Sequence, residues 1–240
     1  MGKFWVNVLL ILPCIIYLGF ENISSKDSGK ANETGHFGSA QTLDVSSARF
    51  LRSYGPTLRR YSSKYGLDWR LVLAVMRAES RFRPEASSFR GAEGLMQIMP
   101  VTESQIAEEL GLEEDAFRAP HTNIRGGIYY LGKIYKSFDR QGISTENRIR
   151  LTLASYNAGA GRIADARTIA KYMNDDPNEW GSVKSSLSLL SRKYSPLHAL
   201  VWESGKPTSG YYRQWQQTTG YVDTIMSFYA DYCKLIPENA

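Results

Sequence analysis

Apolar residues recur through most of the chain at the three- and four-residue spacing of amphipathic α-helices. The clearest helix is predicted over residues 68–79, with Asp68 as its N-cap. Residues 71–76 are apolar in succession, so no face of this helix suits water. We therefore expect this helix at the centre of the fold.

Other helices are predicted from the same spacing and from residues that favour helix ends. One helix should begin at a capping box, Thr102–Gln105, and end at Gly111, and another should follow an N-cap and first-turn proline at Asp176–Pro177. Further helices are expected over Asn123 to Tyr135, Glu146 to Ser155, Arg162 to Tyr172 and residues 222–229. Residues 194–218 show no clear period, and that length is unusual for a loop, which indicates a functional surface. Alternating strand patterns are scarce, so the predicted fold class is all-α with at most a small β-hairpin.

The first part of the 240-residue chain differs from the rest. Residues 4–20 carry no charge and follow Lys3, which predicts a signal peptide or a short membrane anchor. The run is marginal in length for a membrane span, and Pro13 disfavours a straight helix. Lipid attachment at Cys14 is a third option, which Pro13 and the apolar residues after Cys14 oppose. All three interpretations predict export from the cytoplasm.

Composition separates a tether from a folded domain. Residues 21–43 are rich in Ser, Gly, Asn, Lys and Glu and are expected to form a flexible tether, whereas residues 44–237 suit one folded domain. The formal net charge of +5 suits an anionic partner such as cell-wall polymer, lipid headgroups or nucleic acid. Because no basic run is longer than Arg59–Arg60 and no nucleic-acid motif occurs, we interpret the charges as a solvated surface.

The cysteines and histidines do not predict a metal site. Cys14 and Cys233 are the two cysteines, and Cys233 lies in an apolar helical pattern, where a buried free thiol is expected. The histidines, His36, His121 and His198, lack the spacing of metal ligands. We therefore expect neither a metal nor another cofactor.

Glu79 ends the apolar helix and is the candidate for acid–base chemistry. The negative end of the helix dipole and burial among apolar neighbours both disfavour its charged form, so its pKa should be raised. A carboxyl group that keeps its proton near neutral pH can protonate the leaving oxygen of a glycosidic bond. Gln97, in the segment that follows, could hydrogen-bond sugar N-acetyl groups. Taken alone, a Glu at a helix end is more often a solvated surface residue.

Three blocks of the chain carry a family pattern. The first block contains Glu79, Ser80, Phe82, Pro84, Ala86, Ser88, Gly91, Ala92, Gly94, Leu95, Met96, Gln97, Met99, Pro100 and Thr102. The others contain Asn123, Ile124, Gly127, Tyr130 and Leu131, then Ala154 and Tyr156–Gly159. Together they resemble the soluble-type (SLT) lytic transglycosylases, and residues 165–180 look most like the membrane-bound F-type branch. The resemblance implies a mainly helical α+β fold similar to goose-type lysozyme.

The resemblance also implies functional roles. Glu79 would be the catalytic acid/base, and the implied partner is a peptidoglycan glycan strand, met by a monomer in the periplasm or cell envelope. The implied substrate-binding residues are Ser88, Gly94, Gln97, Met99, Tyr156, Asn157, Gln217 and Tyr221. The Tyr156–Gly159 turn is also typical of a helix stop, and both interpretations hold if the turn places Tyr156 beside Glu79.

One acid suffices if the substrate supplies the nucleophile. Glu85 and Glu93 are interpreted as solvated charges of a loop. The family reaction is non-hydrolytic, because the C6 hydroxyl of N-acetylmuramic acid attacks its own C1 and closes a 1,6-anhydro ring. A lysozyme-like hydrolase and a non-catalytic peptidoglycan-binding protein are the alternatives.

Two departures from the family pattern leave the substrate contacts open. Gln217 stands where the family often carries Glu before Thr218. If that position only orients groups by hydrogen bonding, Gln can serve, but if its charge matters, activity should fall. Residues 201–210 also differ from the Tyr-Gly-Tyr-Cys-Arg-Gly-like segment that the F-type branch tends to have.

Overall fold

The computed structural model describes residues 43–139 and 142–237, and the structural statements below concern these two ranges. The predicted signal or anchor segment, Cys14 and all of the predicted tether except Leu43 lie outside the described residues.

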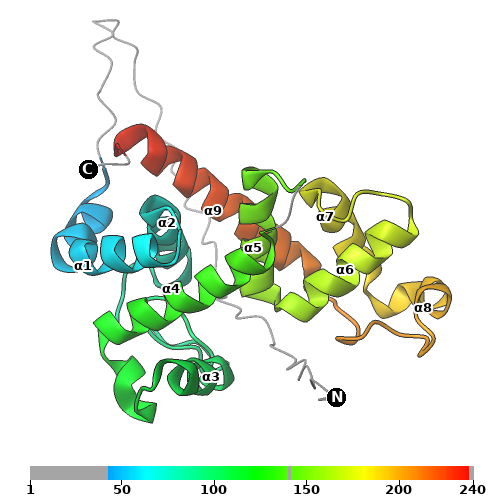
Figure 1. The fold of residues 1–240 in the computed structure, drawn as a ribbon, viewed down its shortest axis with the longest axis horizontal. Coiled ribbons are helices and arrows are strands. Elements are labelled where there is room, and N and C mark those ends of the chain that lie inside the picture. Colours follow the sequence, from blue (N-terminus) through cyan, green and yellow to red (C-terminus); the bar gives the residue numbers. More distant parts are fainter. Residues whose placement is uncertain (1–42, 140–141, 238–240) are drawn as a thin grey trace, which may run out of the picture.

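Helices joined by loops make up most of the described chain (Figure 1). The α-helices are α1 (Val45–Lys64), α2 (Trp69–Ser80), α3 (Pro100–Leu110), α4 (Pro120–Ser137), α5 (Thr145–Ala158), α6 (Ala160–Tyr172), α7 (Trp180–Leu189), α8 (Ser195–Val201) and α9 (Trp215–Leu235). Two 3-10 helices are η1 (Glu114–Arg118) and η2 (Arg192–Tyr194). Within the described ranges, β-structure is limited to the isolated bridges Ser87–Glu93 and Glu93–Ile98, so the all-α prediction is confirmed.

The predicted central helix is α2. Each of residues 71–76 is at most 2% exposed, and each large aliphatic side chain buried in this way contributes about 1.5–3 kcal/mol. Asp68 caps the helix by accepting the backbone N–H of Arg70 at 2.8 Å, as predicted. α9 packs along α2 and so does α1, which leaves α2 enclosed.

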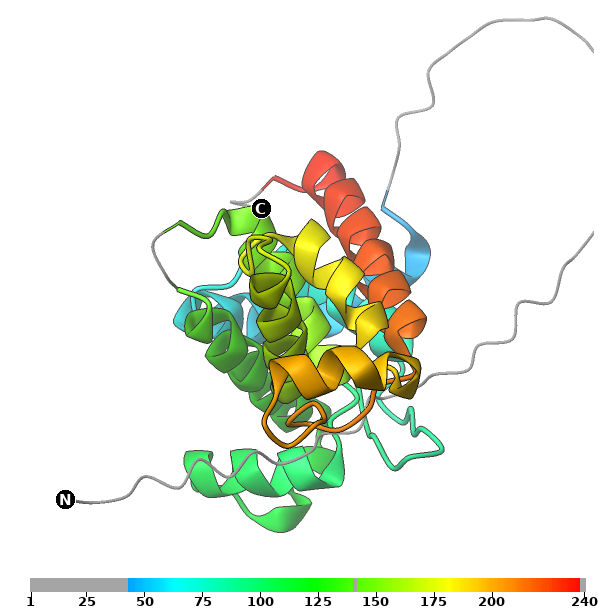
Figure 2. The ribbon, with the colours of Figure 1, turned by 90° about the vertical axis from the view of Figure 1, so that its right-hand side faces the viewer.

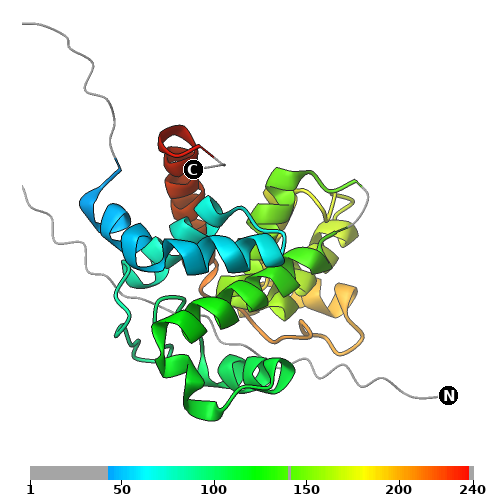
Figure 3. The ribbon, with the colours of Figure 1, turned by 60° about the vertical axis from the view of Figure 1, so that its left-hand side comes forward.

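The other helices gather at two ends of the domain (Figure 1), and Figure 2 views it from the end that carries α6, α7 and α8. α1, α3 and α4 lie at one end, with α1 and α4 side by side (Figure 3). α6, α7 and α8 lie at the other end, while α5 and α9 connect the two and pack on each other. The last helix of the chain is thereby brought against the helix that carries Glu79.

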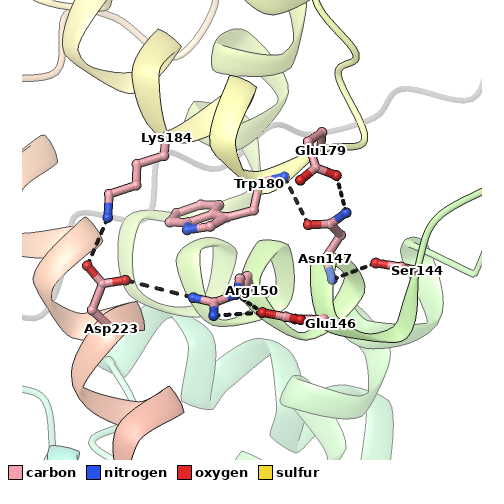
Figure 4. Close-up of polar contacts among 8 residues, drawn as sticks. All are labelled: Ser144, Glu146, Asn147, Arg150, Glu179, Trp180, Lys184 and Asp223. Atoms are coloured by element: carbon pink, nitrogen blue, oxygen red, sulfur yellow. Dashed lines mark hydrogen bonds and ion pairs between the residues drawn. The ribbon is translucent and has the colours of Figure 1, made fainter.

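A row of charged side chains links α5, α7 and α9 (Figure 4). Arg150 of α5 donates to Glu146 at 2.8 Å and lies 3.8 Å from Asp223 of α9. Lys184 of α7 donates to Asp223 at 2.9 Å. These side chains are partly exposed, so each pair contributes only about 0–1 kcal/mol, and we interpret the row as fixing where the three helices meet.

Two predicted helix starts were wrong because a proline at the first helical position sets the start. α3 begins at Pro100 with Met99 as its N-cap, so Thr102 of the predicted capping box lies inside the first turn with a buried side chain. α4 begins at Pro120, which places Asn123 inside the helix rather than at its start.

The predicted N-cap at Asp176 was also wrong, since α7 begins at Trp180. The Asp176 carboxylate instead accepts the backbone N–H of Asn178 at 2.8 Å, which forms an Asx turn before the helix. The aperiodic segment 194–218 is partly helical, because α8 falls within it.

Cys233 is exposed rather than buried, and it forms no disulfide with another described residue. Tyr232 near the end of α9 and Ile236, its C-cap, are buried, whereas Cys233 falls on the outward face. No helix in the part of the chain that the structure describes is both long and apolar enough to cross a membrane.

Candidate active site around Glu79

Glu79 lies in the last turn of α2, and the fold encloses its carboxyl group. The residue is 4% exposed, and this burial raises the pKa of Glu79 to about 8. The direction predicted from the sequence is confirmed, and burial is the cause. Glu79 therefore holds its proton at neutral pH.

Tyr221 of α9 contacts this carboxyl group directly. Its hydroxyl donates to Oε1 of Glu79 at 2.6 Å. The bond favours the carboxylate and lowers the pKa of Glu79, but burial has the larger effect. Because Oε1 accepts this hydrogen bond, Oε2 is the oxygen that can carry the acidic proton.

The backbone after α2 turns in an unusual conformation. Arg81 and Phe82 have φ angles of 51° and 62°, in the left-handed region that favours glycine. Such residues cost about 1 kcal/mol or more each and persist only where packing holds them. The Phe82 ring stacks on Phe50 of α1, with 4.8 Å between ring centroids, which supplies part of that packing. Strained backbone of this kind is typical of functional sites.

Gly94 lets the following loop press against α4. Its φ is 76°, and a Cβ atom there would lie 2.4 Å from Nδ2 of Asn123. Asn123 donates to the carbonyl of Glu93 at 3.0 Å and accepts the N–H of Met96 at 2.9 Å. Asn123 thus holds the loop in place, a role that sequence reasoning missed although the residue stands in the second family block.

Gln97 is buried in this loop with a φ of 47°. Its Nε2 donates to the carbonyls of Ala86 at 2.9 Å and Gly94 at 3.0 Å. Both amide hydrogens are therefore used inside the loop. Oε1 is the group through which Gln97 can meet a sugar, and only as an acceptor.

The Tyr156–Gly159 turn ends α5, which confirms its interpretation as a helix stop. The Tyr156 hydroxyl donates to the carbonyl of Met96 at 2.8 Å, and its ring lies 5.7 Å from that of Tyr130. The turn therefore places Tyr156 against the loop that carries Gln97.

A buried hydrogen-bond network links this turn to α9. The hydroxyl of Thr218 donates to Oδ1 of Asn157 at 2.7 Å and is also bonded to the hydroxyl of Tyr212. Thr218 lies one helical turn before Tyr221. The network therefore fixes the part of α9 whose Tyr221 hydroxyl contacts Glu79. Thr218 and Tyr212 were not predicted as site residues, although Thr218 stands in the family-like block.

The segment that departs from the F-type pattern is anchored to the domain. Asp165 of α6 accepts the backbone N–H groups of Thr208 at 3.2 Å and Ser209 at 2.7 Å. The N–H of Tyr212 donates to the carbonyl of Leu190 at 2.9 Å. The Asp165 carboxylate thus binds backbone N–H groups of this segment, contacts that do not depend on which side chains stand at residues 208 and 209.

The remaining predicted residues lie less centrally. Gln217 is exposed on α9, and Met99 is half-buried at the start of α3. Ser88 is half-buried, and its hydroxyl oxygen accepts a backbone N–H at 2.9 Å within its own turn. Glu85 and Glu93 are exposed, as interpreted from the sequence.

Two surface pockets lie elsewhere. One of about 420 Å³ is formed by α5 and the start of α7, and one of about 720 Å³ by α5 and α9. None of the predicted site residues lines either pocket. Within the described ranges, no cluster of three or more His, Cys, Asp or Glu side chains suits a metal ion. Among the predicted residues, Tyr221 contacts Glu79, Tyr156 contacts the loop that carries Gln97, and Asn157 contacts α9.

The helical fold and its buried acid define a lysozyme-like domain, as predicted. The chain belongs to the Transglycosylase SLT domain family, whose model matches residues 56–179. The predicted family is therefore confirmed.

Individual proteins agree with this assignment. The membrane-bound lytic murein transglycosylase F of Desulfosudis oleivorans is 37% identical over 180 residues, which cover 75% of this chain and 36% of that protein. The protein of the same name from Vibrio campbellii is 31% identical over 88% of this chain and 38% of its own length. The solved 70-kDa soluble lytic transglycosylase SLT70 of Escherichia coli matches 79% of this chain and 25% of its own, with a TM-score of 0.50 and 25% identity. The chain thus spans less than two fifths of the length of these relatives.

Proposed function

We propose that this chain is a peptidoglycan lytic transglycosylase that cleaves the β-1,4 bond between N-acetylmuramic acid and N-acetylglucosamine. The observation that carries the proposal is the buried Glu79, whose pKa of about 8 keeps a proton available at neutral pH. Relatives named lytic murein transglycosylases support the substrate class.

In the first step, Glu79 acts as the acid. Its Oε2 donates a proton to the glycosidic oxygen, the bond from that oxygen to C1 of N-acetylmuramic acid breaks, and the N-acetylglucosamine-containing fragment leaves. The 2-acetamido oxygen of the substrate stabilises the positive charge at C1. Glu79 is left as a carboxylate, which the hydrogen bond from Tyr221 stabilises.

In the second step, the same carboxylate acts as the base. It takes the proton from the C6 hydroxyl, whose oxygen attacks C1 and closes the 1,6-anhydro ring. The attacking group is part of the same sugar, so its effective concentration can be on the order of 10⁵ M or more, and water need not compete. Glu79 regains its proton, and no oxidant, reductant or water is consumed.

The residues around Glu79 would bind the glycan strand. We propose this role for Ser88, Gly94, Gln97, Met99, Tyr156, Asn157 and Tyr221, with Gln217 at the exposed edge. The protein would bind this strand as a monomer, outside the cytoplasm, in the periplasm or cell envelope. The apolar run at residues 4–20 serves as a signal, an anchor or a lipid-attachment segment, and relatives named membrane-bound support a place at a membrane.

The test is mass spectrometry of the products from purified peptidoglycan sacculi digested with the full chain. Fragments with 1,6-anhydro ends are expected. Reducing ends that carry solvent oxygen would instead identify a hydrolase. Sacculi that stay intact would identify a non-catalytic peptidoglycan-binding protein.

Two variants complete this experiment. Glu79→Gln should reduce cleavage by at least about 10²–10⁴-fold while the helical circular dichroism is retained. The matched control is Glu85→Gln, an exposed acid in the loop after α2, which should cleave at the unaltered rate. Normal cleavage by Glu79→Gln contradicts the proposed acid.

A further inference from the structure

The positive charge of the chain is concentrated on two helices. α1 and α4 together carry eight of the 29 Lys and Arg side chains and none of the 24 Asp and Glu side chains. The rest of the chain has 21 cationic against 24 acidic residues, a net charge of −3. α1 and α4 pack side by side (Figure 3), so cations that look scattered in the sequence are brought to neighbouring helices.

Most of the exposed cations of these two helices lie on α1. Lys133 of α4 is paired with Glu109 of α3, and Arg125 is half-buried. Four exposed cations of α1, namely Arg49, Arg52, Arg60 and Lys64, make no ion pair with a residue in the described ranges. We call these four side chains the α1 stripe.

The geometry of the α1 stripe suits a flat surface. With 3.6 residues per turn, its four positions fall within about one third of the helix circumference, and they extend over about 22 Å at a rise of about 1.5 Å per residue. The exposed residues between them, Ser53, Pro56 and Ser63, are uncharged. A row of this length matches an extended anionic surface better than a small ligand.

We propose that the α1 stripe docks the domain on a lipid surface that carries phosphate headgroups. α1 begins directly after the predicted tether, residues 21–43, which follows the uncharged run at residues 4–20. A flexible segment of this length has a root-mean-square reach of about 26 Å, close to the length of the stripe. A bilayer entered by the uncharged run therefore stays within reach of α1. Each Lys or Arg near an anionic bilayer strengthens binding about fivefold.

α1 is tied firmly enough to orient the whole domain. Its N-cap, Asp44, accepts a hydrogen bond from Arg77 of α2 at 3.1 Å, and the hydroxyls of Ser47 and Tyr232 are bonded at 2.7 Å. Docking through α1 therefore sets the direction in which α2 and its terminal acid face.

The experiment measures energy transfer from the protein to vesicles. The full chain, with Cys14→Ser and Cys233→Ser, carries a fluorescent donor at one of two exposed positions. These are Ser53→Cys, between the side chains of the α1 stripe, and Ser185→Cys on α7. Vesicles of phosphatidylcholine, with or without phosphatidylglycerol, carry an acceptor at their headgroups. We expect more transfer from position 53 than from position 185, only when phosphatidylglycerol is present, and less of it as salt is raised.

The decisive variant combines Arg49→Gln, Arg52→Gln, Arg60→Gln and Lys64→Gln. At about fivefold for each residue, it should lower the ratio of docked to undocked protein by on the order of 600-fold. A charge-matched control combines Lys171→Gln, Arg192→Gln, Lys193→Gln and Lys206→Gln, four exposed cations elsewhere, and should leave the ratio unchanged. Equal transfer from both positions, or equal loss in both variants, overturns the proposal.

A second outcome separates lipid from cell-wall polymer. If the stripe variant keeps its vesicle contact but no longer binds purified sacculi, the stripe recognises wall polymer and the lipid proposal is wrong. The transfer measurement does not need turnover, so it gives the same answer in the Glu79→Gln background and is independent of the proposed catalytic function.

Discussion

The two ends of α2 carry two carboxyl groups with opposite behaviour. Asp68 caps the N-terminal end and Glu79 lies at the C-terminal end. Each accepts a hydrogen bond from a tyrosine of α9, from Tyr229 at 2.8 Å and from Tyr221 at 2.6 Å. Nevertheless, the pKa of Asp68 is lowered and the pKa of Glu79 is raised to about 8.

The difference lies in the neighbouring cation and in the direction of the helix. Burial raises the pKa of Asp68 as well, but the hydrogen bonds and charge of Arg70, 2.6 Å away, outweigh it. The positive end of the helix dipole also favours a carboxylate at Asp68. At Glu79, burial is opposed by Tyr221 alone. A tyrosine donor is therefore too weak to keep a buried acid ionised, and α2 uses one carboxyl group for stability and the other for chemistry.

The largest effect should appear in the pH dependence of stability. The folded pKa of Glu79 lies above its ordinary value of 4.5, so its contribution to stability is full below pH 4.5 and is lost as pH rises to about 8. The loss is on the order of 5 kcal/mol. Glu79→Gln should remove this pH-dependent loss. The measurement is the free energy of unfolding in urea at pH 4.5 and at about pH 8, for both proteins. Parallel stability curves for both proteins would mean that Glu79 titrates normally.

Asp68→Asn should cost about 2 kcal/mol of unfolding free energy at neutral pH, because Arg70 loses its partner and α2 its charged cap. The folded pKa of Asp68 is lowered, so this difference should shrink as pH falls below its ordinary value of 3.8. Asp115→Asn, which breaks an exposed ion pair with Arg118, is the control and should change stability by less than about 0.5 kcal/mol. An equal cost for both substitutions would remove the special role of Asp68.

Tyr221→Phe should lower turnover about tenfold, because the carboxylate formed after proton transfer loses its donor. The same bond lowers the pKa of Glu79, so the loss of activity at alkaline pH, near pH 8 in the unaltered protein, should move to higher pH. Tyr229→Phe is the matched control on the same helix, and it should affect stability but not the pH profile. If Tyr221→Phe leaves the pH profile of activity unchanged, burial alone sets the pKa of Glu79.

Gln217→Glu should have the smallest effect. The side chain is exposed, so a charge there is screened by water, and turnover should change by less than about fivefold. The measurement is the rate of release of soluble fragments from sacculi. A much larger gain would mean that the charge of the usual family residue takes part in the reaction.

The local features of the fold could be predicted from the sequence. The span and burial of α2, its cap at Asp68 and the raised pKa of Glu79 follow from the apolar run and the helix end. Errors arose where two local signals competed. The Thr102 capping box and the Asp176–Pro177 pair are both good helix starts, but Pro100 had already begun α3 and an Asx turn occupied Asp176.

Contacts between distant segments were not accessible to the same reasoning. Neither periodicity nor capping indicates that Tyr221 reaches Glu79, since the two residues meet only when α9 packs along α2. The loop contacts of Asn123 and the bond between Thr218 and Asn157 are of the same kind. The family pattern named most of the residues involved, but not their partners.

The position of α9 has a consequence for the size of the working unit. The family model ends at residue 179, yet the donor that contacts the acid stands at Tyr221, and Tyr232 anchors the first turn of α1. A fragment cut at the family boundary would keep Glu79 but expose it to water and deprive it of Tyr221. Transplanting this domain into another protein therefore requires α1 through α9 as one piece, because the first and last helices together close the interior in which the acid keeps its proton.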